Sequence, residues 1–90
     1  MKTTPIVIYG QDWIIKYPKR HKLFKKVVGW ANHTKNEIVI QSKLPETQQK
    51  SIILHELIHI ITEANDIDLT ETETKALESG LFSVIDFELR

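Results

Sequence analysis

The sequence contains no cysteine, one methionine, and only three glycines and three prolines among its 90 residues. The absence of cysteine excludes disulfide bonds, thiolate metal sites and a cysteine nucleophile. No apolar run is long enough to cross a bilayer, and the first ten residues lack the apolar core of a secretory signal. We therefore expect a soluble, cytoplasmic protein. With 41% hydrophobic residues, residues 1–90 are expected to form one globular domain.

Net charge is also absent overall, because 12 basic and 12 acidic side chains balance. The two halves nevertheless differ in sign, since residues 1–45 carry nine Lys or Arg and residues 46–90 carry ten Asp or Glu. Six of the bases lie between Lys16 and Lys26, a block that could meet phosphates. We interpret this basic block instead as a solvated surface that complements the acidic half of the same domain. Nucleic acid is therefore not an expected partner, and neither is a membrane.

Short β-branched and aromatic runs between turn residues predict strands in the first half of the chain. These runs lie at residues 6–9, 12–17, 27–31 and 37–41. The second half repeats apolar residues at helical spacing, over residues 45–64 and 70–88. Strands followed by helices predict an α+β fold, in which two C-terminal helices pack on a small antiparallel or mixed sheet of three to four strands.

The first predicted helix carries the segment His55-Glu56-Leu57-Ile58-His59, which reads H-E-x-x-H. Successive helical residues turn by about 100°, so the two histidines lie about 40° apart and one turn along the helix. Both imidazoles can therefore reach one tetrahedral metal ion, which is typical of zinc. Glu56 projects beside that site, where a general base for metal-bound water is needed. We predict His55 and His59 as zinc ligands and Glu56 as the catalytic base.

A catalytic zinc site needs a third protein ligand, and the lack of cysteine leaves His, Asp or Glu. The downstream candidates are the acidic residues Asp66, Asp68, Glu71, Glu73 and Glu78. Glu73 is in helical phase with Leu77 and Leu81, which we expect to form the inner face of the last helix. Glu73 is therefore the preferred third ligand. Two alternatives stay open, namely Glu71 as the ligand and a capping box in which Glu73 caps Thr70.

The β-rich first half, the helix with I-L-H-E-L-I-H-I and the segment T-E-T-E-T-K-A-L-E-S-G-L-F together resemble the small phage and prophage minimal zincins. These are related to the ImmA/IrrE-type metallopeptidases of the gluzincin class. The resemblance implies a third ligand on the helix after the H-E-x-x-H helix, usually with a small residue three positions later. Glu73 with Ala76 matches this pattern, and Glu71 with Thr74 matches it less well. A phage origin would place the protein in the cytoplasm of the host cell.

These observations predict a zinc-dependent peptidase with one Zn²⁺ per chain and a protein or peptide substrate. Zinc would acidify its bound water, and Glu56 would accept the proton. An extended peptide could pair with a sheet edge near residues 29–31 or 37–41. Candidates for stabilising the oxyanion are Tyr9, Tyr17, His21 and His33. The alternative is a non-catalytic zinc-binding interaction module of phage or prophage origin.

Overall fold

The computed structural model describes residues 3–85, and within that range four strands precede two helices. The strands are β1 (Thr3–Ile8), β2 (Gln11–Lys16), β3 (Gly29–Asn32) and β4 (Glu37–Ile40), with a short 3-10 helix η1 (Lys22–Lys25) between β2 and β3. The helices are α1 (Glu46–Ala64) and α2 (Glu71–Val84). The predicted α+β class and strand number are confirmed, whereas the predicted end of the last helix at residue 88 lies outside the described residues.

The sheet is mixed, with the strand order β1-β2-β4-β3. β1 and β2 form an antiparallel hairpin, β4 pairs in parallel with β2, and β3 pairs antiparallel with β4. The hairpin turns at Tyr9 and Gly10, whose φ values of 50° and 76° are those of a two-residue turn that follows the strand twist. The turn therefore lies one residue earlier than residues 10–11, the gap between the first two predicted strands. Because β4 lies inside the sheet, β3 is the edge strand on this side.

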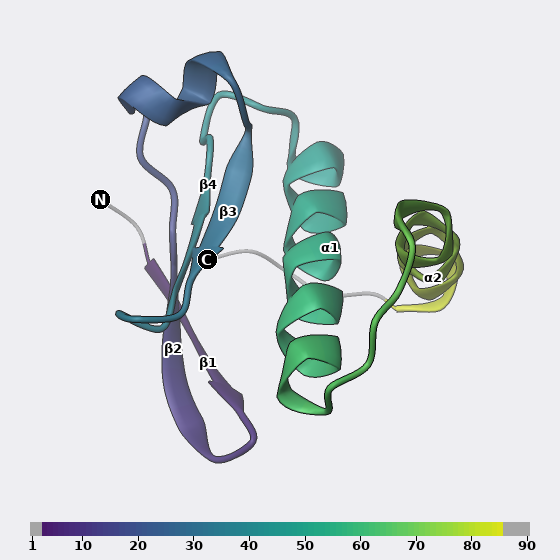
Figure 1. The fold of residues 1–90 in the computed structure, drawn as a ribbon. Coiled ribbons are helices and arrows are strands. Elements are labelled where there is room, and N and C mark those ends of the chain that lie inside the picture. The colour runs from purple at the N-terminus through teal and green to yellow at the C-terminus, as the bar shows by residue number, and fades with distance from the viewer. Residues whose placement is uncertain (1–2, 86–90) are drawn as a thin grey trace.

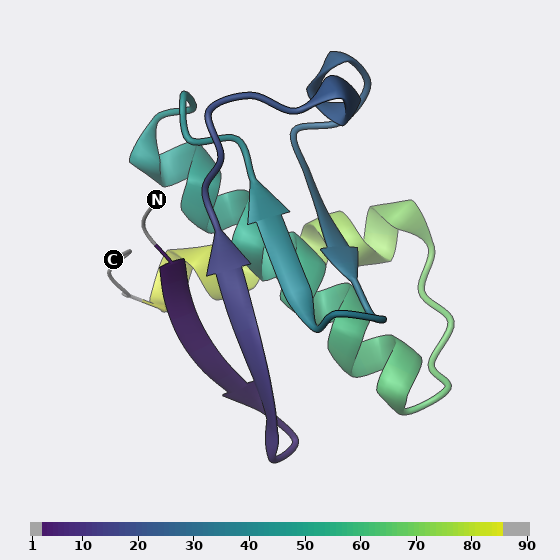
Figure 2. The ribbon, with the colours of Figure 1, turned by 90° about the vertical axis from the view of Figure 1, so that its left-hand side faces the viewer.

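The molecule has three layers, because α1 covers one face of the sheet and α2 lies on the far side of α1 (Figure 1). Seen through the sheet, both helices lie behind the four strands (Figure 2). The core between sheet and α1 consists mainly of isoleucines, joined by Trp13 of β2. The helices therefore share one side of the sheet as predicted, with the refinement that α2 packs on α1. Neither α1 nor α2 is long and apolar enough to cross a membrane.

Gly29, the first residue of β3, allows α1 to approach the sheet closely. A β-carbon at this position would lie 2.6 Å from Cγ2 of Ile52 on α1 and 3.1 Å from the carbonyl oxygen of Val39. The first distance is shorter than any ordinary carbon contact, so the Ile52 side chain, the helix or the strand would have to shift. The absence of a side chain at residue 29 thus sets the spacing between α1 and the edge strand.

We expect Gly29→Ala to lower the free energy of unfolding by about 1–3 kcal/mol, because overpacking forces such a shift. The measurement is urea unfolding followed by circular dichroism. Gly80→Ala is the matched control, since a β-carbon at Gly80 in α2 meets no atom within 4 Å. It should raise stability by about 0.5–1 kcal/mol, the usual gain on replacing a helical glycine. A Gly29→Ala protein as stable as the parent would contradict this account of the spacing.

Candidate functional site

Helix α1 places His55 and His59 one turn apart on the flank that faces α2. The helix begins after Pro45, which is the N-cap residue rather than the predicted first helical residue. The Nε2 atoms of the two histidines lie 3.0 Å apart, and the rings meet edge to face with centroids 4.6 Å apart. Two nitrogen lone pairs can therefore be aimed at one point in space, as a metal ion requires.

The orientation of His55 is set by a hydrogen-bond chain that crosses from α1 to α2. The Nδ1–H of His55 donates to Oε1 of Glu78 over 2.8 Å, and Oγ of Ser51 donates to Oε2 of the same carboxylate over 2.7 Å. A carboxylate that accepts the Nδ1 proton leaves the lone pair of the ring on Nε2. Glu78 and Ser51 thus hold His55 in the tautomer that suits a metal ligand.

Glu71, in the first turn of α2, completes a group that could hold a metal ion. Its Oε1 lies 3.8 Å from Nε2 of His55, and one ligand atom each from His55, His59 and Glu71 lie within 4.8 Å of one another. Two imidazole nitrogens and one carboxylate oxygen form a donor set that zinc and related ions bind. Among residues 3–85, this is the group of metal-ligating side chains that the fold brings together.

Glu73 is directed elsewhere, because its carboxylate belongs to a capping box at the start of α2. Its Oε1 accepts from the backbone N–H of Thr70 over 2.8 Å, while Oγ1 of Thr70 accepts from the N–H of Glu73 over 3.1 Å. These bonds hold the pKa of Glu73 below its ordinary value. The structure thus adopts the capping alternative, and Glu73 does not join the histidines in any metal-ligating group of the described residues.

The predicted inner face of α2 was wrong, which explains the position of Glu73. Leu77 and Leu81, expected to face inward, are 45% and 37% exposed, whereas Thr74 is 1% exposed. The side of α2 that meets α1 carries Thr74 and Glu78, one turn apart. The hydroxyl of Thr74 donates to the carbonyl of Thr70 over 3.0 Å, so its burial leaves no unpaired polar atom.

Glu56 lies on a different flank of α1 and is half-buried. Burial raises the pKa of its carboxyl above the ordinary value, although His55 and His59 act in the opposite direction. Glu63 and His33 also act electrostatically on Glu56, and they form an ion pair with Nε2 and Oε2 3.0 Å apart. The half-buried carboxyl of Glu56 therefore lies within electrostatic reach of both the histidines and the polar pair formed by His33 and Glu63.

Of the four candidates for stabilising an oxyanion, His33 is the one that lies close enough to Glu56 to influence its carboxyl electrostatically. The others have local partners: the hydroxyl of Tyr9 accepts from Asn65 Nδ2 and that of Tyr17 shares a hydrogen bond with Thr4. Nδ1 of His21 caps η1 by accepting from the N–H of Leu23. The fold thus brings His33 alone of these four into electrostatic reach of the proposed base.

Ser51 was not assigned a role from the sequence, and Glu78 was named only as one of the candidate third ligands and not as the partner of His55. A signal was present in their spacing. Ser51 precedes His55 by one turn of α1, and Glu78 follows Thr74 by one turn of α2. A small polar residue and a carboxylate on the facing sides of two helices can bond across the interface. Which sides face each other, however, depends on the docking of α2.

The chain was also compared with known proteins. The family model described as the IrrE N-terminal-like domain, a peptidase family, matches residues 16–84. This range runs from the end of β2 to the end of α2 and so includes every residue of the site described above. Neither the curated proteins nor the solved structures gave a match.

The capping box makes a pH-dependent contribution to stability that can be measured. The pKa of Glu73 is lowered in the folded state, so its contribution is present above the unfolded pKa of about 4.3 and is lost as the pH falls through the folded pKa. We expect Glu73→Ala to lower the melting temperature at pH 7 and to have a smaller effect at pH 3. In a Thr70→Ala background the substitution should have little effect at either pH. An undiminished effect at pH 3 would contradict this account.

Proposed function

Because the chain belongs to the peptidase family of the IrrE N-terminal-like domain, we propose that it is a zinc-dependent peptidase that cleaves a peptide bond in a specific protein substrate. The observation that carries the proposal is the placement of one carboxylate, Glu56, beside a cluster of two histidines and Glu71. This arrangement supports hydrolysis, because cleaving a peptide bond with water requires a Lewis acid that polarises the carbonyl group and a base that accepts a proton from the water.

In this proposal His55, His59 and Glu71 hold the ion, and Glu78 keeps Nε2 of His55 available by accepting the proton of Nδ1. Glu73, preferred from the sequence, becomes the alternative third ligand, because its carboxylate caps α2. The donor set suits zinc, which favours imidazole and carboxylate ligands at a site with an open position. When bound, zinc supplies a Lewis acid and lowers the pKa of water.

Glu56 has the role of general base and then general acid. Its half-buried carboxylate has a raised pKa, which brings its proton affinity closer to neutral pH than that of an exposed glutamate. It would accept the proton from the attacking water and deliver it to the leaving amine. The same carboxylate cannot also act as a ligand of the histidine cluster without losing this role, which agrees with its position on another flank of α1.

The edge strand β3 offers a place for the substrate backbone. Its outer side lacks a neighbouring strand among the described residues, so a peptide in extended conformation can add to the sheet by main-chain hydrogen bonds. Gly29 and Ala31 share the α1 side of the sheet with Ile40 and Ile38, their partners on β4. On this side α1 lies close to β3, because Ile52 packs against Gly29, so the peptide backbone would lie along the outer edge of β3. The second predicted edge, residues 37–41, is wrong because β4 is an inner strand.

The three carboxylates of α2 provide a matched test of the ligand set. We expect Glu71→Ala to cause the largest loss of zinc affinity, because it removes a ligand atom. Glu78→Ala should weaken binding by about 10–100-fold, which is typical of a residue that orients a ligand. Glu73→Ala should leave the affinity unchanged. The measurement is competition with a chromogenic chelator at pH 7. A loss confined to Glu73→Ala would restore Glu73 as the third ligand.

Activity is tested with the zinc-loaded chain and a peptide library made from a digested proteome, with new termini identified by mass spectrometry. We expect Glu56→Gln to retain zinc and to slow cleavage by at least about 100-fold, because a positioned base contributes about 10²–10⁴ to the rate. Glu46→Gln is the matched control, since Glu46 lies in the first turn of α1 and pairs with Lys50.

Equal cleavage by the Glu56→Gln protein would contradict the peptidase proposal. If the parent chain binds zinc and cuts no peptide or protein, the non-catalytic zinc-binding module becomes the better description. The Glu56→Gln protein would then bind its partner as well as the parent does, while a chelator would abolish that binding.

A further inference from the structure

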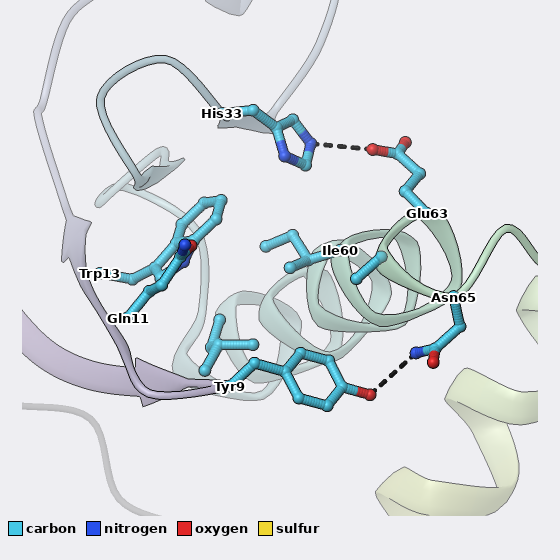
Figure 3. Close-up of a pocket in the computed structure, with 9 residues that line it drawn as sticks. Tyr9, Gln11, Trp13, His33, Ile60, Glu63 and Asn65 are labelled. Carbon is cyan, nitrogen blue, oxygen red and sulfur yellow. Dashed lines mark hydrogen bonds and ion pairs between the residues drawn. The ribbon is translucent and has the colours of Figure 1, made fainter.

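A pocket of about 490 Å³ opens between the hairpin of β1 and β2 and the last two turns of α1 (Figure 3). This volume falls within the range of roughly 300–1,000 Å³ that is usual for small-ligand pockets. Its floor belongs to the core, since Ile8, Trp13 and Ile60 are each less than 10% exposed. The pocket is thus an open end of the hydrophobic layer between the sheet and α1.

Four of the polar residues that line the pocket are paired with one another. His33 and Glu63 form their ion pair on one side, and the hydroxyl of Tyr9 accepts a hydrogen bond from Asn65 on another (Figure 3). The ring of Trp13 meets that of His33 edge to face, with centroids 5.6 Å apart. An acidic side chain would be repelled by Glu63, and a basic one would meet that carboxylate only at the exposed rim and would find no partner on the apolar floor. The apolar floor therefore favours a large, uncharged side chain.

The pocket continues the face of α1 that carries Glu56. Ile60 follows Glu56 by one helical turn and Glu63 by two, so their axial separations from Glu56 are about 6 and 10 Å. The opposite wall includes His33, the residue directly after the edge strand β3. A peptide that follows β3 advances about 3.3 Å per residue. It therefore passes Glu56 and reaches the pocket two or three residues later.

We propose that this pocket is the subsite that selects the substrate, by receiving a large apolar side chain two or three residues from the cleaved bond. The inference rests on the proposed peptidase function, and it assigns to the substrate a class of side chain that neither the family nor the metal-binding group specifies. The occupant belongs to a peptide rather than to a free small molecule, because the open edge of β3 leads to the pocket.

The test uses the zinc-loaded Glu56→Gln protein, which is expected to hold peptides without cutting them. The probes are blocked alanine hexapeptides with Phe, Arg or Asp at one position, titrated while the indole N–H resonance of Trp13 is followed by NMR. Trp30→Phe removes the second of the two tryptophans and so assigns the signal. We expect Phe peptides to shift the Trp13 signal and to bind at least about tenfold more tightly than Arg or Asp peptides.

Ala64→Phe fills the pocket from its exposed rim and should weaken binding of the Phe peptides at least about tenfold. Ser83→Phe, a substitution at an exposed position near the end of α2, is the matched control and should leave their affinity unchanged. An unmoved Trp13 signal, equal binding of Arg or Asp peptides, or an unaffected Ala64→Phe protein would overturn the inference.

Failure of the pocket and failure of the peptidase function are distinguishable. The binding test needs no catalysis, because it is made with a protein that lacks the proposed base. Cleavage by the parent chain tests the function without reference to Trp13. If the library is cleaved at sites with no preference for an apolar residue two or three positions away, the assignment of the pocket as a subsite is overturned and the peptidase proposal stands.

Discussion

The carboxylate of Glu78 joins the second and third layers of this small protein. It accepts from Ser51 and His55 of α1 with its two oxygens, and hydrogen bonds to a charged group contribute about 1.5–3 kcal/mol each. α2 packs against α1 and lies away from the sheet, so this bridge fixes which side of α2 faces inward. The same bridge aims His55 at His59. One interaction therefore determines both the docking of a helix and the geometry of the candidate metal-binding group.

That interaction also explains why Glu71 rather than Glu73 approaches the histidines. Glu71 and Glu78 are seven residues apart, two turns of helix, and therefore lie on one side of α2. Glu73 lies about 200° around the helix from Glu71, where it can cap Thr70 and remain exposed. Hydrophobic phase favoured the opposite orientation, with Leu77 and Leu81 inward. A polar bridge and the small buried Thr74 outweigh that preference, because α2 covers a helix flank that is itself partly polar.

The sequence predicted the features that depend on local patterns. The strand and helix order, the α+β class and the helical position of His55, Glu56 and His59 follow from periodicity and spacing over a few residues. The capping box of Thr70 and Glu73 at the start of α2 was likewise predicted, as the alternative to Glu73 as a metal ligand. The inner position of β4 and the inward side of α2 could not be read in this way. Both depend on contacts between segments distant in sequence, such as the parallel pairing of Ile15 with Ile38 and the bond from Ser51 to Glu78.

A metal-binding group divided between two helices links metal affinity to helix docking. His55 and His59 come from α1 and Glu71 from α2, so the full ligand set exists only when α2 is docked. Any ion that binds the docked state more tightly stabilises that state by the same free energy. The position of Glu56 does not depend on the docking of α2, because Ile53 and Ile60 hold α1 against the sheet. The proposed base and the floor of the pocket therefore belong to the unit formed by the sheet and α1, whereas the metal-binding group also depends on α2.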